Sequence, residues 1–573
     1  MSNDIPKVTH PKIAEAFDLM TRGRMNRREF VRIAALLGVS AGTAYALAGV
    51  KPAAAADMAM PFPADDAAAK MGGKIRIAMQ IQKMEDPATY SWVQMSNQTR
   101  QITEYLVMTG VDNVTRPMLA EKWEASPDLK TWTFTLRKGV MWHNGEELTS
   151  EHIKWNFMRW CDPKVASSNI GLSTFSSIVQ EVDKGEKDDK GNAKKTKELI
   201  AGSIETPDKY TIKLNLAKPV LSVPEDLYNY PTTILHPSFK APFHDNPIGT
   251  GPYRLTELKV GEKCLLQRVT KTTDGKDFTY WGGKVYLDEI QYLHYEAENQ
   301  LAAMQSGQVD AIYEFTSDQM ELAKSIAGAQ IIPARTAQTN VVRMQIDQKP
   351  FDNIKVRKAM QMSIDRSAIK ALVYSDGGDV GEDHHVSPLH PEYFALPPIK
   401  RDVAGAKAML KEAGIENLEV TVDVGNTEGP WQQQMVEAMR DQMKDAGIKL
   451  NLNVMPANKY WEIWDKTAFG ATSWTHRPLG TMVLSLAYRS GVPWNETHYK
   501  NPAFDAALNE AEATLDVVAR KAKMEKVQKI LQDDAIILQS LWRPIFSVAA
   551  KKVHGYPAHP TQYHQLNKVW VDA

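Results

Sequence analysis

A short stretch near residue 475 carries three side chains that together could bind a small molecule. Trp474 offers a flat apolar wall, and Arg477 offers a planar guanidinium fork that matches a carboxylate or a phosphate. His476 lies beside Arg477 and suits a neutral hydrogen-bond donor better than a catalyst. We therefore expect Arg477 to receive an anionic group of a ligand. The alternatives are that Trp474 is packed in a core, and that Arg477 lies on the surface or pairs with an acid such as Glu428.

A second group of candidate ligand-binding residues follows a predicted strand. Residues 418–424 alternate apolar and polar side chains, and the loop 425–431 begins at the carboxyl end of that strand. Ligands of open α/β sheets bind at this edge. We expect Asn426, Glu428 and Trp431 to contribute there. Trp494 and the early loop 86–92 are further candidates, because aromatic side chains hold a flexible ligand with little loss of entropy.

The sequence predicts neither a catalytic centre, nor a cofactor, nor a metal site. His384 and His385 could ligate a metal, but adjacent histidines of a strand point apart, and a solvated loop is the alternative we favour. Residues 249–252, Gly-Thr-Gly-Pro, lack the Lys-Ser/Thr of a phosphate loop and predict a turn. Cys161 and Cys264 could form one disulfide in an oxidising compartment, and the sequence leaves their separation open.

Composition narrows the class of protein. The chain has 573 residues, which predicts two or more domains, and 43% of them are hydrophobic, as in a globular protein. Lys plus Arg number 68 and Asp plus Glu 69, and this balance argues against a nucleic-acid binder. Two cysteines exclude a disulfide-rich scaffold.

The elements that must position these side chains form an α/β layer structure. Alternating hydrophobicity predicts strands at 75–79, 132–136 and 210–216. In the second half, predicted helices at 402–413 and 431–446 each stop at a glycine and precede strands at 418–424 and 448–454. A final helix is expected at 517–533. The highly charged residues 181–200 predict a solvated hairpin tip.

Residues 1–56 are similar to a twin-arginine signal peptide. Arg27 and Arg28 precede Phe30, and an uncharged, weakly hydrophobic stretch runs over residues 33–50. Residues 53–56, Ala-Ala-Ala-Ala, offer a cleavage site before Asp57. The alternative is a membrane anchor, because about 18 uncharged residues can just span a bilayer. Beyond residue 56 no stretch is long and apolar enough to cross a membrane, so we expect a soluble, exported, periplasmic product.

Five segments in order resemble one family, the extracellular solute-binding proteins of peptide/nickel-type ABC importers (family 5, dipeptide- and oligopeptide-binding-like). They cover roughly residues 72–560. The segments are 119–149, with Trp123, Trp132, Phe134, Gly139 and Trp142; 247–253, Pro-Ile-Gly-Thr-Gly-Pro-Tyr; 303–310, Ala-Met-Gln-Ser-Gly-Gln-Val-Asp; 350–366, with Pro-Phe-Asp-Asn and Ser-Ile-Asp-Arg at its ends; and 406–414, which ends in Glu-Ala-Gly.

The resemblance implies an α/β, two-lobed periplasmic binding protein (type II, cluster C-like) with an extra subdomain in its N-terminal lobe. It places lobe I at 72–295 and 542–573, with the extra subdomain near 93–220, and lobe II at 296–541. Strands at 290–295 and 541–546 are the expected hinges. The ligand would lie between the lobes, where pockets preferentially form.

The resemblance also implies function. The protein would be a monomer and would not be an enzyme. It would capture a solute by hinge closure and deliver it to an inner-membrane ABC permease with cytoplasmic ATPases. It would have no nucleic-acid partner. Dipeptide-binding members hold the ligand's amine with a Trp-x-x-acid motif, and here Arg477 occupies the acidic position after Trp474. We therefore expect a peptide or an amino-acid-derived compound bearing an acid group. The alternatives are a metal or haem carrier of the same fold, and an exported hydrolase.

Overall fold

One mixed sheet runs through the molecule and organises both of its halves. The computed structural model describes residues 10–49, 62, 65–187, 193–374, 377–557 and 559–572. The strand order is β10-β11-β12-β1-β13-β19-β14-β18-β16-β17, and β15 pairs with β19. The strands are β1 (Lys74–Met79), β10 (Tyr253–Lys259), β11 (Lys263–Arg268), β12 (Glu289–His294), β13 (Ala311–Ile312), β14 (Ala329–Met344), β15 (Asp379–Val380), β16 (Leu418–Val424), β17 (Ile448–Val454), β18 (Phe469–Trp474) and β19 (Ile537–Ala550).

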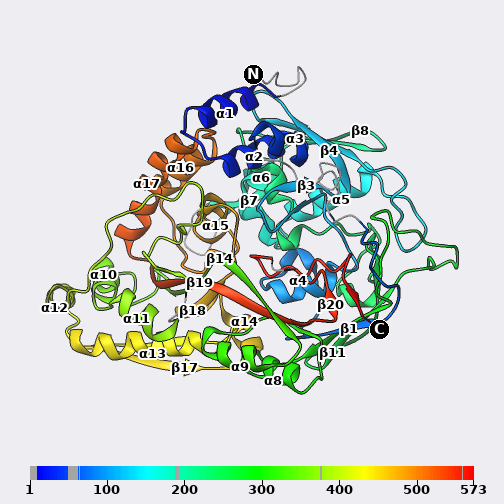
Figure 1. Cartoon of the computed structure of the whole chain (residues 1–573). Coiled ribbons are helices and arrows are strands. Elements are labelled where there is room, and N and C mark those ends of the chain that lie inside the picture. Colours follow the sequence, from blue (N-terminus) through cyan, green and yellow to red (C-terminus); the bar gives the residue numbers. More distant parts are fainter. Residues whose placement is uncertain are drawn as a thin grey trace.

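Two long antiparallel strands, β14 and β19, join the halves. β19 pairs with β13 through Ala549, whereas β14 pairs with β18 along Thr339–Met344. The two strands therefore cross from the first lobe, which holds β1 and β10–β13, to the second lobe, which holds β16–β18 (Figure 1). The expected type II, two-lobed α/β fold is thus confirmed.

The expected hinge at 290–295 is wrong, because that segment lies in β12, between β11 and β1 within the first lobe. The other expected hinge, 541–546, does lie in a crossing strand, β19. The helix α8 (Gln300–Gln305) packs on β1, and Leu301 and Ile312 share a core with Ala78. The sheet therefore places the first crossing in β14, and we propose a lobe boundary near residue 329 in place of 296.

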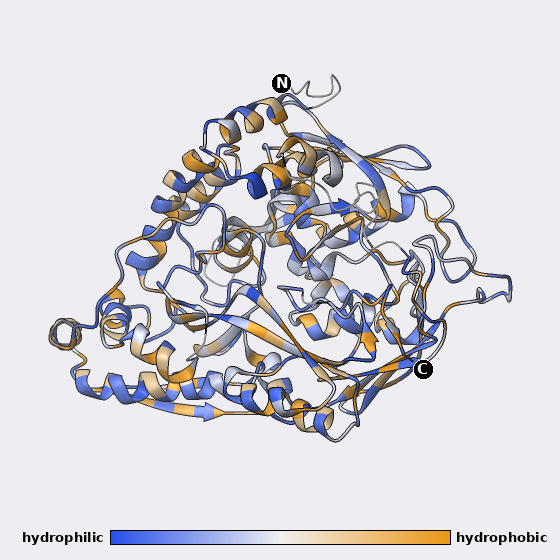
Figure 2. Ribbon diagram, in the orientation of Figure 1, coloured by the Kyte–Doolittle hydropathy of each residue, from blue (hydrophilic) through white to orange (hydrophobic). Residues whose placement is uncertain are grey.

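The second lobe follows the predicted alternation of helices and strands. The helix α12 spans Val403–Glu412 and α13 spans Trp431–Met443, and the strands after them are β16 and β17, as predicted. Gly447 ends the second helix with a φ of 79°, a left-handed conformation that glycine adopts without strain. Hydrophobic and hydrophilic residues form bands along α13 (Figure 2), and its apolar face packs into the core of this lobe. The other helices of this half are α10 (Ile354–Met362), α11 (Arg366–Val373), α14 (Ala457–Ile463), α15 (Gly480–Ala487), α16 (Pro502–Glu512) and α17 (Val517–Asp534). The helix α9 (Met320–Ser325) belongs to the first lobe, where Ala323 shares a core with Ala78.

The first lobe carries an additional antiparallel sheet of the order β4-β5-β9-β8, which contains the predicted strands 132–136 and 210–216. A hairpin of β6 and β7 holds the charged segment 181–200, whose tip, 188–192, lies outside the described residues. Cys161 and Cys264 are both buried and free, so the possible disulfide is not formed. Elements of this region are α4 (Val93–Thr99), β2 (Val107–Thr109), β3 (Thr115–Pro117), β4 (Ala120–Ala125), β5 (Thr131–Leu136), α5 (Ser150–Cys161), α6 (Ser173–Ser176), β6 (Val179–Lys187), β7 (Ala193–Leu199), β8 (Ile204–Asp208), β9 (Thr211–Asn215) and α7 (Val223–Asp226).

The first and last segments that the structure describes pack against this body. Helices α1 (Pro11–Thr21), α2 (Arg27–Leu36) and α3 (Ala41–Leu47) precede β1, and the strands β20 (Val553–His554) and β21 (Trp570–Val571) pair at the other end. The expected cleavage site at 53–56 lies outside the described residues. None of the helices in the described part of the chain combines the length and hydrophobicity that a membrane span requires.

Candidate functional site

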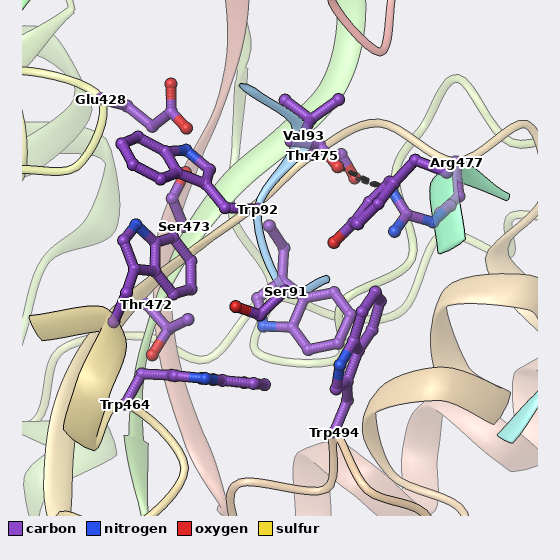
Figure 3. A pocket seen from close by; sticks show the side chains of 13 residues that line it. Ser91, Trp92, Val93, Glu428, Trp464, Thr472, Ser473, Thr475, Arg477 and Trp494 are labelled. Carbon is purple, nitrogen blue, oxygen red and sulfur yellow. Dashed lines mark hydrogen bonds between the residues drawn. The ribbon is translucent and has the colours of Figure 1, made fainter. Parts of the chain in front are cut away.

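A pocket lies where the two lobes meet (Figure 3). The first lobe supplies residues just before and at the start of α4 together with Tyr230, and the second lobe supplies the end of β18 and the loops near it. The lining residues are Ser91, Trp92, Val93, Tyr230, Glu428, Trp461, Trp464, Thr472, Ser473, Trp474, Thr475, Arg477 and Trp494. The space open to water-sized molecules is about 20 Å³, enough for one or two waters. The lobes are therefore closed in this structure, and a larger ligand needs them to part.

Aromatic rings form most of the pocket wall. Trp474 and Trp494 meet edge to face, with their centroids 5.8 Å apart, and Tyr230 stacks on Trp494 at 5.6 Å. On the other side, the ring centroid of Trp461 lies 5.7 Å from that of Trp92 and 5.9 Å from that of Trp464. Such walls present rigid apolar faces with few rotatable bonds, which suits capture of a small solute.

Arg477 is fixed in place by neutral partners. Its Nη1 donates to Thr475 Oγ1 at 2.7 Å and to the His476 carbonyl at 3.1 Å. Its guanidinium carbon lies 5.3 Å from the Tyr230 ring centroid and 5.9 Å from that of Trp494. In the described part of the chain, its Nε has no hydrogen-bond partner and it forms no ion pair with an acid. A buried guanidinium with a free donor edge can receive an anionic ligand group.

Trp474 is held by a buried ion pair behind it. Its indole nitrogen donates to Glu496 Oε1 at 2.8 Å, and Glu496 Oε2 accepts from Arg343 Nε at 2.8 Å and from Thr472 Oγ1 at 2.6 Å. Arg343 and Glu496 are both almost completely buried. This network sets the orientation of the indole face toward the pocket.

Glu428 lines the pocket and does not pair with Arg477. Its Oε2 lies 3.7 Å from Arg543 Nη2, which also donates to Glu314. Burial, and then the nearby Glu314 carboxylate, raise the pKa of Glu428 well above its ordinary value. The raised pKa favours the protonated, neutral form of the Glu428 carboxyl in the pocket.

Three other predicted site residues lie outside the lining. The Trp431 indole donates to the Glu428 carbonyl at 2.9 Å and its ring lies 4.9 Å from the Arg543 guanidinium carbon, so it supports the pocket from behind. Asn426 Oδ1 accepts from the Gln433 backbone nitrogen at 3.1 Å within the first turns of α13. His476 faces a separate cavity of about 410 Å³.

His476 is a buried neutral imidazole. Its Nδ1 accepts from the Ala337 backbone nitrogen at 3.0 Å, and its Nε2 lies 3.3 Å from Asn113 Oδ1. Burial lowers the pKa of His476 well below its ordinary value. The imidazole thus joins the crossing strand β14 to a turn of the first lobe.

The expectation that His384 and His385 lie in a solvated loop is wrong. Both side chains are buried, and His385 Nδ1 lies 2.7 Å from the hydroxyl of Tyr488 while His384 Nε2 lies 3.2 Å from Gln528 Nε2. They pack on the second lobe, where aromatic and amide side chains satisfy them. In the portion of the chain that the structure describes, no cluster of three or more metal-ligating side chains occurs.

Sequence reasoning missed Tyr230, Trp461 and Trp464. Trp461 and Trp464 follow β17, and the carboxyl ends of β16 and β17 lie at the same edge of the parallel pair. The rule that drew attention to the loop after β16 therefore applied equally to the segment after β17. Tyr230 comes from the first lobe, and no local sequence pattern predicted that it would line the pocket.

Several buried polar groups at the site lack partners. Among the described residues, Ser473 Oγ and Trp461 Nε1 make no hydrogen bond, and neither does either amide atom of Asn340 or Gln338. In the sheet, Asn340 lies opposite Ser473 and Gln338 lies opposite Arg543, so these side chains share one face. Buried polar groups without partners are costly, and several in one place indicate a site that a ligand or water satisfies.

Two serine motifs typical of hydrolases occur in the chain, away from the pocket. Residues 38–42 spell Gly-x-Ser-x-Gly, and there Ser40 is the N-cap of α3. Residues 367–370 spell Ser-x-x-Lys within α11. Neither serine lines the pocket. They give the hydrolase alternative no catalytic arrangement at the site.

Comparison with known proteins agrees with this geometry. Residues 114–490 match the family described as bacterial extracellular solute-binding proteins, family 5. The dipeptide-binding protein DppE of Bacillus subtilis is 25% identical, over 94% of this chain and 98% of that protein. Heme-binding protein A of Haemophilus influenzae is 25% identical, over 80% and 84%. The structure of AgaA from A. tumefaciens R10 in complex with agropinic acid has a TM-score of 0.75 at 22% identity, covering 87% of this chain and 99% of that one.

Proposed function

The chain belongs to the family 5 bacterial extracellular solute-binding proteins, and we propose that it captures a peptide or an amino-acid-derived compound with an acid group. One observation carries the proposal. Arg477 stands in an aromatic pocket between the lobes, with a free donor edge and no acidic partner among the described residues. A buried cation of this kind favours a carboxylate and disfavours an ammonium group.

The other polar groups of the pocket support an acceptor-rich ligand. Ser473 Oγ, Trp461 Nε1 and Arg477 Nε are hydrogen-bond donors without a partner in the described chain. Glu428, whose raised pKa favours its protonated form, adds a further donor in that form. Carboxylates and amide carbonyls are the groups that satisfy such donors, and a free α-amine is not expected to dock at Arg477.

A relative with an acidic ligand agrees with this chemistry. AgaA, which has the same fold, was solved in complex with agropinic acid. The dipeptide-binding relative keeps peptides among the candidates. We therefore propose that the ligand class is acid-bearing amino-acid conjugates or modified peptides.

Capture would proceed by closure of the two lobes on the solute. The pairing of β14 with β19 shifts register between Ala334 and Gln338, which gives each crossing strand a point where it can bend. We propose that residues 335–337 form the hinge. Closure would exclude water and strengthen the polar contacts of Arg477.

The closed, loaded protein would act as a monomer, located in the periplasm after twin-arginine export. It would dock on an inner-membrane ABC permease, and cytoplasmic ATPases would drive transport, because the chain has no P-loop of its own. The pattern of residues 26–50 supports the leader, and membership of the family supports the permease.

Mass spectrometry of the compound that co-purifies with the native protein tests the proposal most directly. We expect an acid-bearing compound, and its readdition to ligand-free protein should raise the melting temperature by mass action. An absorption spectrum of the same preparation tests the haem alternative suggested by the haem-binding relative. A basic ligand without an acid group, or a haem band, would overturn the proposal.

A further inference from the structure

The N-terminal helices pack on the body as an integral part of its core. Ile13 in α1 and Phe30, Ile33 and Leu36 in α2 are completely buried. Figure 1 shows α1–α3, in dark blue, beside α16 and α17 and next to β3 and β4. Arg27 and Arg28 stay exposed at the start of α2. The residues expected to form an export leader thus bury their apolar side chains in the folded chain.

A buried network of charges links these helices to the body. Arg32 donates to Glu29 at 2.8 Å and, through Nη1, to both oxygens of Glu225 at 2.8 and 2.9 Å. Arg520 donates in turn to Glu29. The four side chains are at most 5% exposed, and their two positive and two negative charges balance. Removal of any one member would leave a buried charge unpaired, which is strongly unfavourable.

The network and its neighbours connect α2 to both lobes. Glu225 belongs to α7 of the first lobe, where the Trp123 indole also donates to the Leu36 carbonyl at 2.7 Å. Arg520 belongs to α17 of the second lobe, and Arg24 forms an ion pair with Asp516 just before that helix. Direct contacts between the lobes exist nearby, such as Lys218 with Asn509.

We infer that the surface formed by α7, β4 and the start of α17 is a docking site for residues 10–49, and that these residues, when docked, tie the two lobes together. The docked segment holds the ligand pocket closed and slows exchange of solute while it remains attached. Loss of this segment, by removal or by undocking, frees the lobes to open. The inference concerns the control of the cleft and does not depend on which solute the pocket takes.

Two glycines of the segment provide a matched test. Gly23 and Gly38 each follow a helix with a positive φ, 72° and 89°. At both sites the glycine nitrogen donates to the carbonyl three residues back, and the next nitrogen donates to the carbonyl five residues back. A Cβ on Gly38 would meet the Trp123 carbonyl oxygen at 2.4 Å, whereas a Cβ on Gly23 would meet nothing within 4 Å. Gly38→Ala and Gly23→Ala therefore impose similar backbone strain, and only Gly38→Ala blocks docking on β4.

Both variants are made in the full-length chain and compared by two measurements. Hydrogen exchange of amides 27–47 reports docking, because buried helices protect their amides. Acrylamide quenching of tryptophan fluorescence reports the cleft, since 5 of the 14 tryptophans line the pocket. For Gly38→Ala we expect at least tenfold faster exchange of these amides and a clear rise in the quenched fraction. Gly23→Ala should resemble the unchanged protein in both.

Two results would overturn the inference. Amides 27–47 that exchange as fast as an unfolded segment in the unchanged protein would show that the segment is not docked. Faster exchange in Gly38→Ala without a rise in quenching would show that docking does not hold the cleft closed.

A second variant serves if Gly38→Ala yields too little protein. Arg24→Ala removes only an exposed link to Asp516 and should give smaller changes in the same direction. An Arg24→Ala protein identical to the unchanged one in both measurements would then count against the tie between lobes.

Discussion

The guanidinium carbon of Arg477, in the second lobe, lies 5.3 Å from the ring centroid of Tyr230, in the first. The contact crosses the cleft, so the closed state covers one face of the cation with an aromatic ring and leaves the guanidinium edge to the pocket. Cation–π contacts of this kind become stronger as water is excluded. The pocket is thus assembled by closure, and neither lobe presents it alone.

Arg477→Gln should weaken binding of an acid-bearing ligand by on the order of 2–5 kcal/mol, because the ligand's charge then loses its buried partner. Arg477→Lys keeps the charge but not the planar fork, and should recover part of the loss. Titration calorimetry with the co-purified compound gives both affinities. Equal affinities for all three proteins would remove Arg477 from the site.

Glu496→Ala should destabilise the protein by about 3–5 kcal/mol, because it leaves Arg343 buried without its carboxylate. It should also release the indole of Trp474, whose nitrogen donates to Glu496. Chemical unfolding measures the first effect, and ligand affinity measures the second. Glu496→Gln is the control, because it retains an acceptor for the indole nitrogen of Trp474. If Glu496→Gln loses as much ligand affinity as Glu496→Ala, Glu496 does not position the indole through this hydrogen bond.

Asn340→Leu should stabilise the ligand-free protein by about 1 kcal/mol and at the same time weaken ligand binding. Both amide atoms of Asn340 are buried and unpartnered among the described residues, so an apolar side chain of similar size removes an unfavourable burial. Asn156 is the matched control, because its side chain bonds to the carbonyls of His152 and Leu235 and to the Leu235 nitrogen. Asn156→Leu should therefore destabilise. Asn340→Leu protein that is less stable yet binds normally would show that this amide has no role in the ligand site.

Local patterns predicted the elements and part of the pocket. The helices that stop at Gly414 and Gly447 and the strands after them occur where hydrophobic periodicity places them, because each is determined by its own residues. Trp474 and Arg477 could also be predicted from local sequence, because their side-chain chemistry is distinctive and they lie at or just after the end of a strand. Trp461 could have been found from the same edge of the sheet.

Long-range pairing accounts for what the sequence could not reveal. Residues 290–295 and 329–344 both contribute to strands, β12 and β14, and only the partners of these strands show that β14 crosses between lobes while β12 does not. Tyr230 reaches Arg477 because of closure, a relation between residues some 250 positions apart. The burial of His384 likewise depends on α17, which supplies Gln528.

The Asp226 carboxyl should make a contribution to the free energy of unfolding that falls as the pH rises from about 4 to about 7. Burial raises the pKa of Asp226 from 3.8 to about 7, while its Oδ2 accepts from the Thr174 nitrogen and hydroxyl. The folded protein therefore holds a proton that the unfolded chain has lost, and stability present below pH 4 disappears as the pH passes 7. The full effect of one such group is about 4 kcal/mol. Asp226→Asn keeps an acceptor for Thr174 without a charge. Its unfolding free energy, measured in urea at several pH values, should therefore rise relative to that of the unchanged protein as the pH increases from 4 to 7. Glu104, whose pKa burial also raises to about 7, should contribute with the same sign in both proteins. If the unfolding free energies of Asp226→Asn and of the unchanged protein vary with pH in parallel over this range, Asp226 is ionised in the folded state and its burial does not contribute to the pH dependence.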